Sequence, residues 1–269
     1  GFRSGRRRVS TLVCFHAHPD DESIATGGSI ARAAAEGHRV VLVMGTDGRH
    51  GETPADLAEG EALQDRRKAE TERSAEVLGV KKVHWLGYHD SGMTGWPQNK
   101  EPNSFIGADV ETAALALAKI LQDEQADVFT CYDWHGGYGH PDHIQVHRVG
   151  HRAADIAIAN GQNIRVLEST MNRTRIAQMM EQMGGGDFDP EAPADDGNPF
   201  GTLQEEITMA VDVSEFVQVK RSSIMCHASQ VTDSSMFLQM PPDVFAVAFG
   251  EEFFIEVGQP GGATRGWFM

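Results

Sequence analysis

Over the first two-thirds of the chain, short apolar runs rich in β-branched residues alternate with longer segments whose apolar residues recur at helical spacing. The apolar runs predict strands at residues 9–15, 39–44, 82–86, 126–132 and 164–167. The amphipathic segments predict helices at residues 24–36, 57–78, 110–122 and 142–159. Gly37 and Gly79 follow two of these helices at the position where glycine commonly ends a helix. This alternation predicts an α/β fold, a mostly parallel sheet with helices on both faces.

The pattern changes near Met183. Glycines and prolines between residues 184 and 199 predict a loop, and a strand at 207–213, a helix at 215–230 and a mixed tail follow it. We therefore expect residues 1–183 to form the catalytic core. Residues 184–269 are expected to form a smaller C-terminal α+β lobe that completes the cleft, the two parts making one integrated domain.

Composition is that of an ordinary globular protein, with 269 residues of which 40% are hydrophobic, enough to bury a core without disulfides. The formal net charge of -16 disfavours nucleic acids and anionic membranes as partners. No apolar stretch approaches the roughly 18 residues that a membrane span needs. The run Arg6-Arg7-Arg8 is interpreted as a solvated lead-in to the first strand.

The three cysteines, Cys14, Cys131 and Cys226, are far apart and form no CxxC pair. A disulfide scaffold and a catalytic cysteine are therefore disfavoured. The N-terminal segment also lacks the apolar stretch of a signal peptide. We expect a reducing, cytoplasmic environment.

Two segments share the order His-Pro-Asp, at residues 18–22 (His-Pro-Asp-Asp-Glu) and at residues 140–143 (His-Pro-Asp-His). Each follows a predicted strand, and in open parallel sheets ligands bind at the carboxyl ends of the strands. One histidine and one carboxylate from the first segment, with one histidine from the second, give the three-ligand set of a catalytic zinc site. Such a site leaves its fourth position open to water, so the pattern predicts a metal-assisted hydrolase.

Within these segments the spacing suggests how roles are divided. His18 and Asp21 are three residues apart, so one helical turn brings them together, and Asp20 between them can accept a proton from water. His140 and His143 have the same spacing, so one can bind the metal while the other acts as a general acid.

Neighbouring residues add further candidates. Asp142 can fix the tautomer of an imidazole, Tyr138 can donate to a developing oxyanion, and Glu22 can support a ligand or cap the following helix. His147, one helical turn beyond the second segment, is the strongest rival ligand. Other histidines are interpreted as ordinary surface or core residues: His38, His50, His84, His89, His135, His151 and His227.

Together these segments resemble the zinc-dependent N-deacetylases of the PIG-L/LmbE-like family, in order and spacing over roughly the first 160 residues. Residues 90–93 (Asp-Ser-Gly-Met) and 135–140 (His-Gly-Gly-Tyr-Gly-His) look most like its actinobacterial branch. That branch includes the deacetylase of mycothiol biosynthesis and the mycothiol S-conjugate amidase. Residues 85–88 and 145–148 look nearer the amidase, whereas the turn at residues 23–26 lacks the lysine expected of a close amidase relative.

The resemblance implies a Rossmann-like fold and one zinc ion per chain, held by His18, Asp21 and His143, with Asp20 as the general base. Sites of this composition also accept Fe(II), Co or Ni. The resemblance further implies that His140, oriented by Asp142, acts as the acid or as an electrostatic stabiliser. Tyr138 would help to bind the tetrahedral oxyanion. The residues that match sugar- or inositol-contacting positions are Arg67, Asp90 and Glu52.

The leading hypothesis is hydrolysis of an amide, the N-deacetylation of an N-acetylglucosaminyl substrate, with a small amino sugar or glycoconjugate as the binding partner. Alternatives are a mycothiol S-conjugate amidase, a natural-product glycoside deacetylase, and a non-catalytic metal- or sugar-binding protein. A nucleotide-binding protein is disfavoured, because the first strand ends in His-Pro-Asp-Asp and not in a glycine-rich turn. The sequence is compatible with a homo-oligomer.

Overall fold

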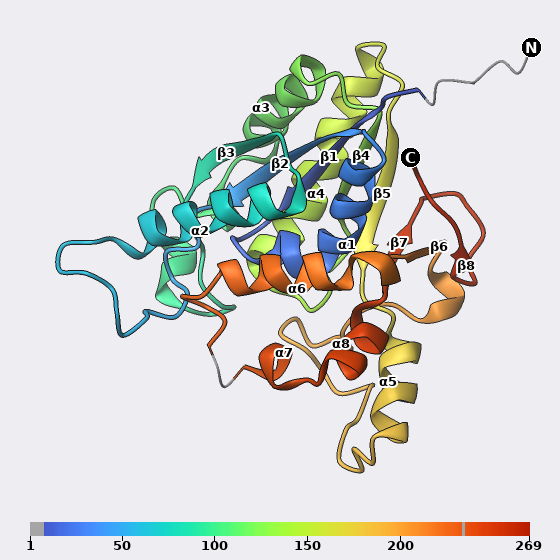
Figure 1. Ribbon diagram of the computed structural model, residues 1–269. Helices are drawn as coiled ribbons and strands as arrows, with labels where there is room; N and C mark the ends of the chain where they lie inside the picture. The colour runs from blue at the N-terminus through green and yellow to red at the C-terminus, as the bar shows by residue number, and fades with distance from the viewer. Residues whose placement is uncertain (1–7, 233–234) are drawn as a thin grey trace, which may run out of the picture.

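The computed structural model describes residues 8–232 and 235–269, and its central element is an eight-stranded, mostly parallel sheet (Figure 1). The strand order is β3-β2-β1-β4-β5-β7-β6-β8. Strands β1 to β5 pair in parallel, whereas β7 runs antiparallel to both of its neighbours. The strands are β1 (Thr11–His16), β2 (Arg39–Thr46), β3 (Lys82–Tyr88), β4 (Val128–Tyr132), β5 (Arg165–Thr170), β6 (Met209–Asp212), β7 (Glu251–Ile255) and β8 (Thr264–Arg265).

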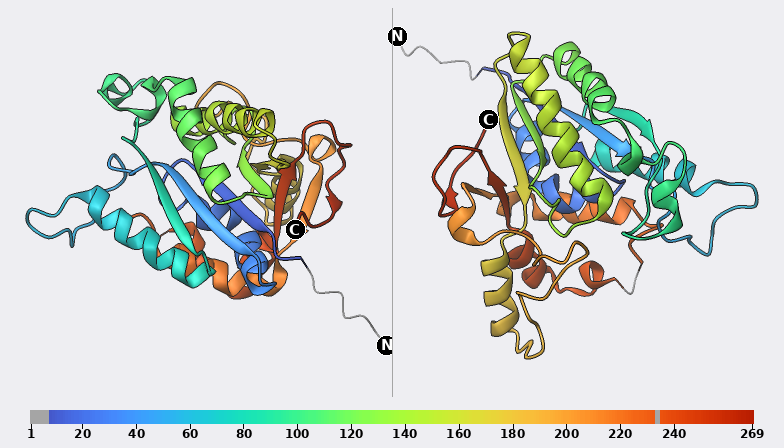
Figure 2. Two further views of the ribbon diagram at one scale, coloured as in Figure 1. Left: turned by 90° about the horizontal axis from the view of Figure 1, so that it is seen from above. Right: turned by 180° about the vertical axis from the view of Figure 1, so that it is seen from behind.

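Helices cover both faces of the sheet, as the view from above in Figure 2 shows. Helices α3 and α4 pack together on one face, and α1, α2 and α6 pack together on the other. The α/β class with a mostly parallel sheet is therefore confirmed. The helices are α1 (Asp21–Ala35), α2 (Leu63–Leu78), α3 (Val110–Asp123), α4 (Pro141–Ala159), α5 (Arg173–Gln182), α6 (Val217–Cys226), α7 (Met236–Gln239) and α8 (Pro242–Phe249).

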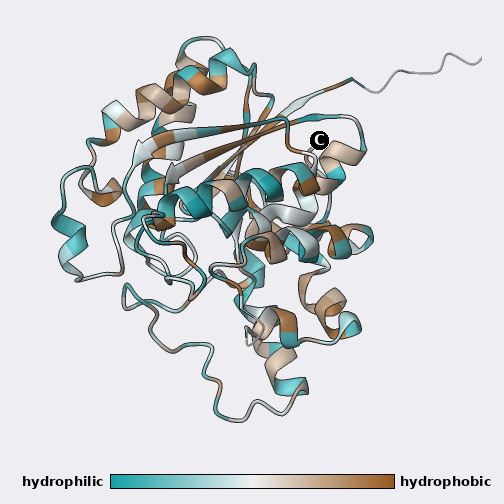
Figure 3. Cartoon of the chain, turned by 60° about the vertical axis from the view of Figure 1, so that its left-hand side comes forward, coloured by the Kyte–Doolittle hydropathy of each residue, from teal (hydrophilic) through white to brown (hydrophobic). Residues whose placement is uncertain are grey.

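The central strands are buried on both sides, which explains why they read as continuous apolar runs. Along β1, Val13 and Phe15 join the core beneath α3 and α4, whereas Leu12 and Cys14 join the core on the opposite face. Figure 3 shows the hydrophobic colour on these strands and a largely hydrophilic α2 at the surface.

Two helices differ most from their predicted bounds. The helix predicted at 57–78 begins at Leu63, because Gly60 adopts a left-handed φ of 78° that a helix cannot contain. The helix predicted at 215–230 ends at Cys226, and the chain then turns at His227. The apolar pattern also misses two elements. Helix α5 is missed because it buries none of its side chains, and β7 is missed because it pairs with β5 and β6, which are distant from it in sequence.

The segment after residue 183 supplies β6, β7 and β8, which extend the same sheet. The division into a core of residues 1–183 and a lobe of residues 184–269 stays a prediction. Arg6 and Arg7 of the N-terminal basic run lie outside the described residues. No helix in the described part of the chain is long and apolar enough to cross a membrane.

A buried ion pair fixes α1, the helix that begins at the first His-Pro-Asp segment. The Glu252 carboxylate of β7 accepts hydrogen bonds from the backbone N–H groups of Gly28 and Ser29, at 2.9 and 2.7 Å. Lys220 of α6 donates to the same carboxylate at 2.6 Å, and both charged side chains are only 2% exposed. Gly28 also lets α1 pack closely against Val213, since a Cβ there would lie 2.6 Å from the Val213 side chain.

We predict that Lys220→Met lowers the free energy of unfolding by about 3–5 kcal/mol, because it leaves the buried Glu252 carboxylate without its counter-charge. Urea denaturation measures this change. Arg152→Met is the matched control, since the Arg152–Glu111 pair is 45% and 50% exposed and its loss should change stability far less. Equal effects of the two variants would contradict the role given to the buried pair.

Candidate metal centre and active site

The chemistry-bearing segments gather at the carboxyl ends of the central strands. Residues 17–20 connect β1 to α1, residues 133–140 connect β4 to α4, and residues 89–92 follow β3. Because β1 and β4 are neighbouring parallel strands, the two His-Pro-Asp segments meet at one edge of the sheet. The sheet topology therefore brings together segments that are about 120 positions apart in the sequence, as the sequence analysis expected.

His18, Asp21 and His143 form a compact group in which one potential ligand atom from each lies within 4.8 Å of the others. Oδ2 of Asp21 lies 3.4 Å from Nδ1 of His18 and 3.2 Å from Nε2 of His143. His18 and His143 are buried, and Asp21 is largely so. These are the residues that the sequence predicts as metal ligands.

Hydrogen bonds on the outer side of each imidazole turn its lone pair toward this centre. Nε2 of His18 lies 2.8 Å from Oδ2 of Asp142, and Nδ1 of His143 lies 3.0 Å from the carbonyl oxygen of Gly136. A carboxylate and a carbonyl only accept, so these nitrogens carry the protons and the opposite nitrogens face Asp21. This outer-shell pattern is typical of metal-binding histidines.

Two observations test whether these residues fit a metal ion. Nε2 of His143 is buried and has no hydrogen-bond partner, so an acceptor nitrogen faces an acceptor carboxylate. Although burial opposes it, Asp90, Asp142 and Asp21 raise the pKa of His18 well above its usual value. The centre thus favours positive charge, and a set of two imidazoles and one carboxylate fits zinc, as it also fits Fe(II), Co or Ni.

A second group, His18, Asp90, His140 and Asp142, has equally close ligand atoms. The potential ligand atoms of Asp142 and His140 are already engaged in hydrogen bonds, however. The Asp142 carboxylate accepts from the Ser91 N–H at 2.9 Å and from the Ser91 hydroxyl at 2.5 Å, as well as from His18. Nδ1 of His140 accepts from the Asp142 N–H at 3.0 Å. The His18, Asp21 and His143 group is therefore the better candidate for a metal site.

The relation between Asp142 and His140 differs from the expected one. The resemblance implies that Asp142 orients His140, but its carboxylate contacts His18 and Ser91. His140 is the N-cap of α4, so it is the backbone N–H of Asp142 that binds its Nδ1. Nε2 of His140 consequently carries the proton when the ring is neutral, and burial with the neighbouring His18 and His143 lowers its pKa to about 2.

Asp20, the predicted base, occupies a backbone conformation that non-glycine residues rarely adopt, with φ of 109°. Its N–H donates to Oε2 of Glu22 at 2.9 Å, and its carboxylate lies 3.5 Å from the Arg67 guanidinium. Arg67 also donates to the carbonyl oxygens of Pro19 and Gly48. Burial raises the pKa of Asp20 to about 7, and Arg67 opposes this rise.

Glu22 is held in turn by a residue from the far end of the chain. Its Oε1 lies 2.5 Å from Nε2 of His227 and 3.0 Å from the Ser74 hydroxyl, and all three side chains are fully buried. From the sequence, His227 is interpreted as an ordinary histidine, and no local signal distinguishes it, since it lies 205 residues from Glu22. A chain of contacts from His227 through Glu22 thus supports the strained backbone of Asp20.

A polar pocket of about 400 Å³ opens beside the metal group. Its lining includes the predicted substrate-binding residues Arg67 and Asp90, but Glu52 is exposed and does not line it. The backbone N–H and carbonyl of Glu52 instead bind the Gln230 side chain. Lining residues that the sequence analysis did not identify as substrate contacts are His50, Met93, Trp96 and Gln230.

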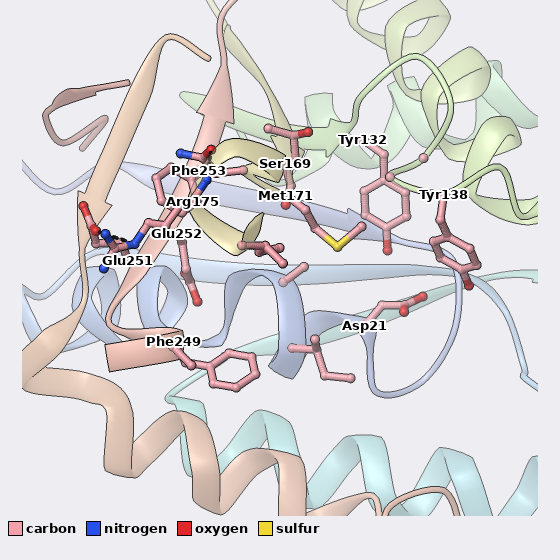
Figure 4. A pocket seen from close by; sticks show the side chains of 18 of the residues that line it. Asp21, Tyr132, Tyr138, Ser169, Met171, Arg175, Phe249, Glu251, Glu252 and Phe253 are labelled. Carbon is pink, nitrogen blue, oxygen red and sulfur yellow. Dashed lines mark hydrogen bonds and ion pairs between the residues drawn. The ribbon is translucent and has the colours of Figure 1, made fainter. Parts of the chain in front are cut away.

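A second, largely apolar pocket of about 260 Å³ shares Asp21 and Tyr138 with the polar pocket, and Figure 4 shows both side chains in its lining. Met171 and Phe249 extend into this cavity from different parts of the chain. Tyr138 lines both pockets, and its ring centroid lies 4.9 Å from that of His143. Burial raises the pKa of Tyr138, which keeps the phenol protonated and able to donate. His147, the rival ligand, lies outside this group and belongs to a separate cluster.

Comparison with known proteins gives a consistent result. Residues 13–154 match the model of the GlcNAc-PI de-N-acetylase family, PIG-L. Two relatives are named 1D-myo-inositol 2-acetamido-2-deoxy-alpha-D-glucopyranoside deacetylase. The one from Acidothermus cellulolyticus is 37% identical over 262 residues, which cover 92% of this chain and 88% of that protein. The one from Thermobifida fusca is 40% identical over 246 residues, which cover 82% and 83% of the two chains.

Among solved structures, N,N'-diacetylchitobiose deacetylase from Pyrococcus horikoshii matches with a TM-score of 0.61 and 24% identity, over 91% of this chain and 82% of that one. The hydratase GalB from Pseudomonas putida matches with a TM-score of 0.57 and 18% identity, over 93% of this chain and 96% of that one. At these identities the likeness concerns the fold alone, and a deacetylase and a hydratase share it.

We predict that Asp142→Asn weakens zinc binding about 10- to 100-fold, because the charge that holds the His18 ring is removed. Competition with a chelator of known affinity measures this change without reference to activity. Asp123→Asn, which alters an exposed pair with Lys119, serves as the control and should bind zinc normally. Unchanged affinity in Asp142→Asn would show that this carboxylate does not support the metal ligand.

Proposed function

Because the chain belongs to the GlcNAc-PI de-N-acetylase family, PIG-L, we propose that it is a metal-dependent amidohydrolase that removes the acetyl group from an N-acetylglucosaminyl substrate. One observation carries this proposal. The potential ligand atoms of His18, Asp21 and His143 lie close together, and His18 and Asp21 line a polar pocket together with Asp20.

The substrate class follows from the relatives and from the pocket. The relatives are named for a 2-acetamido-2-deoxy-glucopyranoside linked to myo-inositol, and we propose the same class for this chain. Arg67 and Asp90 in the polar pocket supply a fixed donor and an acceptor for sugar or inositol hydroxyls. A small-molecule amino sugar is therefore the proposed partner.

We propose zinc as the native metal, with His18, Asp21 and His143 as its ligands. When bound there, zinc supplies Lewis-acid activation of the amide carbonyl and of water. Asp142 orients the imidazole of His18, and the carbonyl of Gly136 orients that of His143. The neighbouring carboxylates of Asp90 and Asp142 would offset the positive charge of the metal ion.

The remaining steps belong to side chains around this group. Asp20 accepts a proton from the attacking water on its carboxylate, and the same carboxylate can pass that proton to the departing amine nitrogen. Tyr138 donates its phenolic hydrogen to the developing oxyanion. Because Nδ1 of His140 accepts from the Asp142 N–H, His140 presents Nε2–H and acts as a hydrogen-bond donor that stabilises the oxyanion. This geometry favours the stabilising role of His140 over that of a general acid.

A second candidate, cleavage of a larger amide such as a mycothiol S-conjugate, is favoured by one observation. The apolar pocket borders Asp21 and Tyr138 and has room for an acyl group larger than acetyl. Comparing kcat/KM for N-acetyl and longer N-acyl derivatives of one amino sugar separates the candidates. A preference for the longer acyl group that disappears in Met171→Trp would favour the amidase, and a preference for acetyl would favour the deacetylase.

We also propose a cytoplasmic location. Cys14, Cys131 and Cys226 all have free thiols, which suits a reducing compartment. A homo-oligomer stays an open expectation from the sequence.

We predict that Asp20→Ala lowers kcat/KM for acetate release from N-acetylglucosaminyl-inositol by about 10²- to 10⁴-fold while the protein retains its metal. Asp21→Ala is the paired variant, and it should lose both metal and activity because it removes a ligand. Acetate assay and metal analysis on the same preparations make the comparison. Near-normal turnover in Asp20→Ala would refute its assignment as the base.

A further inference from the structure

Two imidazoles and one carboxylate form a second cluster outside the catalytic centre. His147 and His151 lie one turn apart on the same face of α4, and Glu168 lies on β5. One potential ligand atom from each lies within 4.8 Å of the others. We propose that His147, His151 and Glu168 bind a second divalent transition-metal ion, independently of the proposed catalytic function.

Both imidazoles converge on one carboxylate oxygen. Oε2 of Glu168 lies 2.6 Å from Nε2 of His151 and 3.2 Å from Nδ1 of His147, and the two rings are 4.6 Å apart between centroids. The carbonyl oxygen of Tyr132 lies 2.9 Å from Nδ1 of His147 and fixes the orientation of that ring. Because a carbonyl only accepts, Nδ1 of His147 carries a proton in this arrangement, and an ion bound there would displace that proton.

Burial and charge at the cluster suit an ion that enters from solvent. The Glu168 side chain is 9% exposed, whereas those of His147 and His151 are 26% and 29% exposed. A buried carboxylate needs a compensating positive charge. Within the described parts of the chain, the ion pairs of Glu168 are with these two histidines, so no lysine or arginine supplies that charge.

A similar pair elsewhere shows what distinguishes this cluster. His84 lies 2.9 Å from Glu124, but the guanidinium of Arg39 lies 2.8 Å from the same carboxylate and already provides its charge. That pair also has one imidazole instead of two. The combination of two imidazoles with one carboxylate is the donor set that zinc, cobalt and nickel accept.

The cluster is close to the catalytic centre but not part of it. His147 follows His143 by one turn of α4, while Tyr132 contacts the His143 ring with its own ring and His147 with its carbonyl. None of the three proposed ligands lines the polar or the apolar pocket. An ion bound there would connect α4 to β5 without contacting the substrate.

The test is the number of metal ions bound by the full chain. The protein is stripped with a chelator and equilibrated with zinc by dialysis, and bound metal is counted by elemental analysis. We expect about two equivalents in the unaltered chain, and about one in His151→Ala and in Glu168→Gln. His84→Ala is the matched control and should keep about two equivalents, since it removes a histidine from the comparison pair.

A further single variant, His143→Ala, distinguishes the proposed second metal site from the proposed catalytic metal site. That variant should lose one equivalent and acetate release together, whereas His151→Ala should lose one equivalent and keep acetate release. The one equivalent of zinc that each variant still binds shows that the chain has folded. A single equivalent in the unaltered chain that disappears in His143→Ala would overturn the second site. Retention of two equivalents in both His151→Ala and Glu168→Gln would overturn it as well.

Discussion

Buried negative charge at the carboxyl edge of the sheet is the constraint on which the site depends. Asp21, Asp90 and Asp142 surround His18, and all three carboxylates are largely or fully buried. Isolated buried carboxylates are costly, so their arrangement around imidazole nitrogens requires positive charge at this point. The raised pKa of His18 and the unpartnered Nε2 of His143 are two consequences of that requirement. A divalent cation held by His18, Asp21 and His143 would meet both.

At the same edge of the sheet, distant parts of the chain are needed to hold Asp20 in its unusual backbone conformation. Asp20 has a φ of 109°, and such a conformation persists only where its surroundings hold it. Glu22 of α1, Arg67 of α2 and His227, which follows α6, provide that support from three different parts of the chain. The fold by itself does not determine the chemistry, since a hydratase shares it with deacetylases. What distinguishes this chain is the set of side chains placed at the ends of β1, β3 and β4.

The sequence predicts the elements that depend on local patterns. Strands β1 to β5 and helices α1, α3 and α4 follow from apolar runs and helical spacing, and the candidate metal ligands follow from two short motifs. Contacts between distant segments are not predicted, because no local pattern encodes them. The position of β7 between β5 and β6 is one case, and the contact of His227 with Glu22 is another. Asp142 contacts His140 through its backbone N–H and His18 through its carboxylate, a division that the motif does not show because it does not reveal that His140 caps α4.

The most direct test measures zinc content and acetate release together in the purified chain, with N-acetylglucosaminyl-inositol as the substrate. The account predicts acetate release that a chelator abolishes and zinc restores, together with a bound equivalent that disappears when His143 is replaced by alanine. Bound zinc without acetate release would keep the metal site and contradict the proposed substrate. If no metal binds through His18, Asp21 and His143 even after zinc is added, the central claim is wrong.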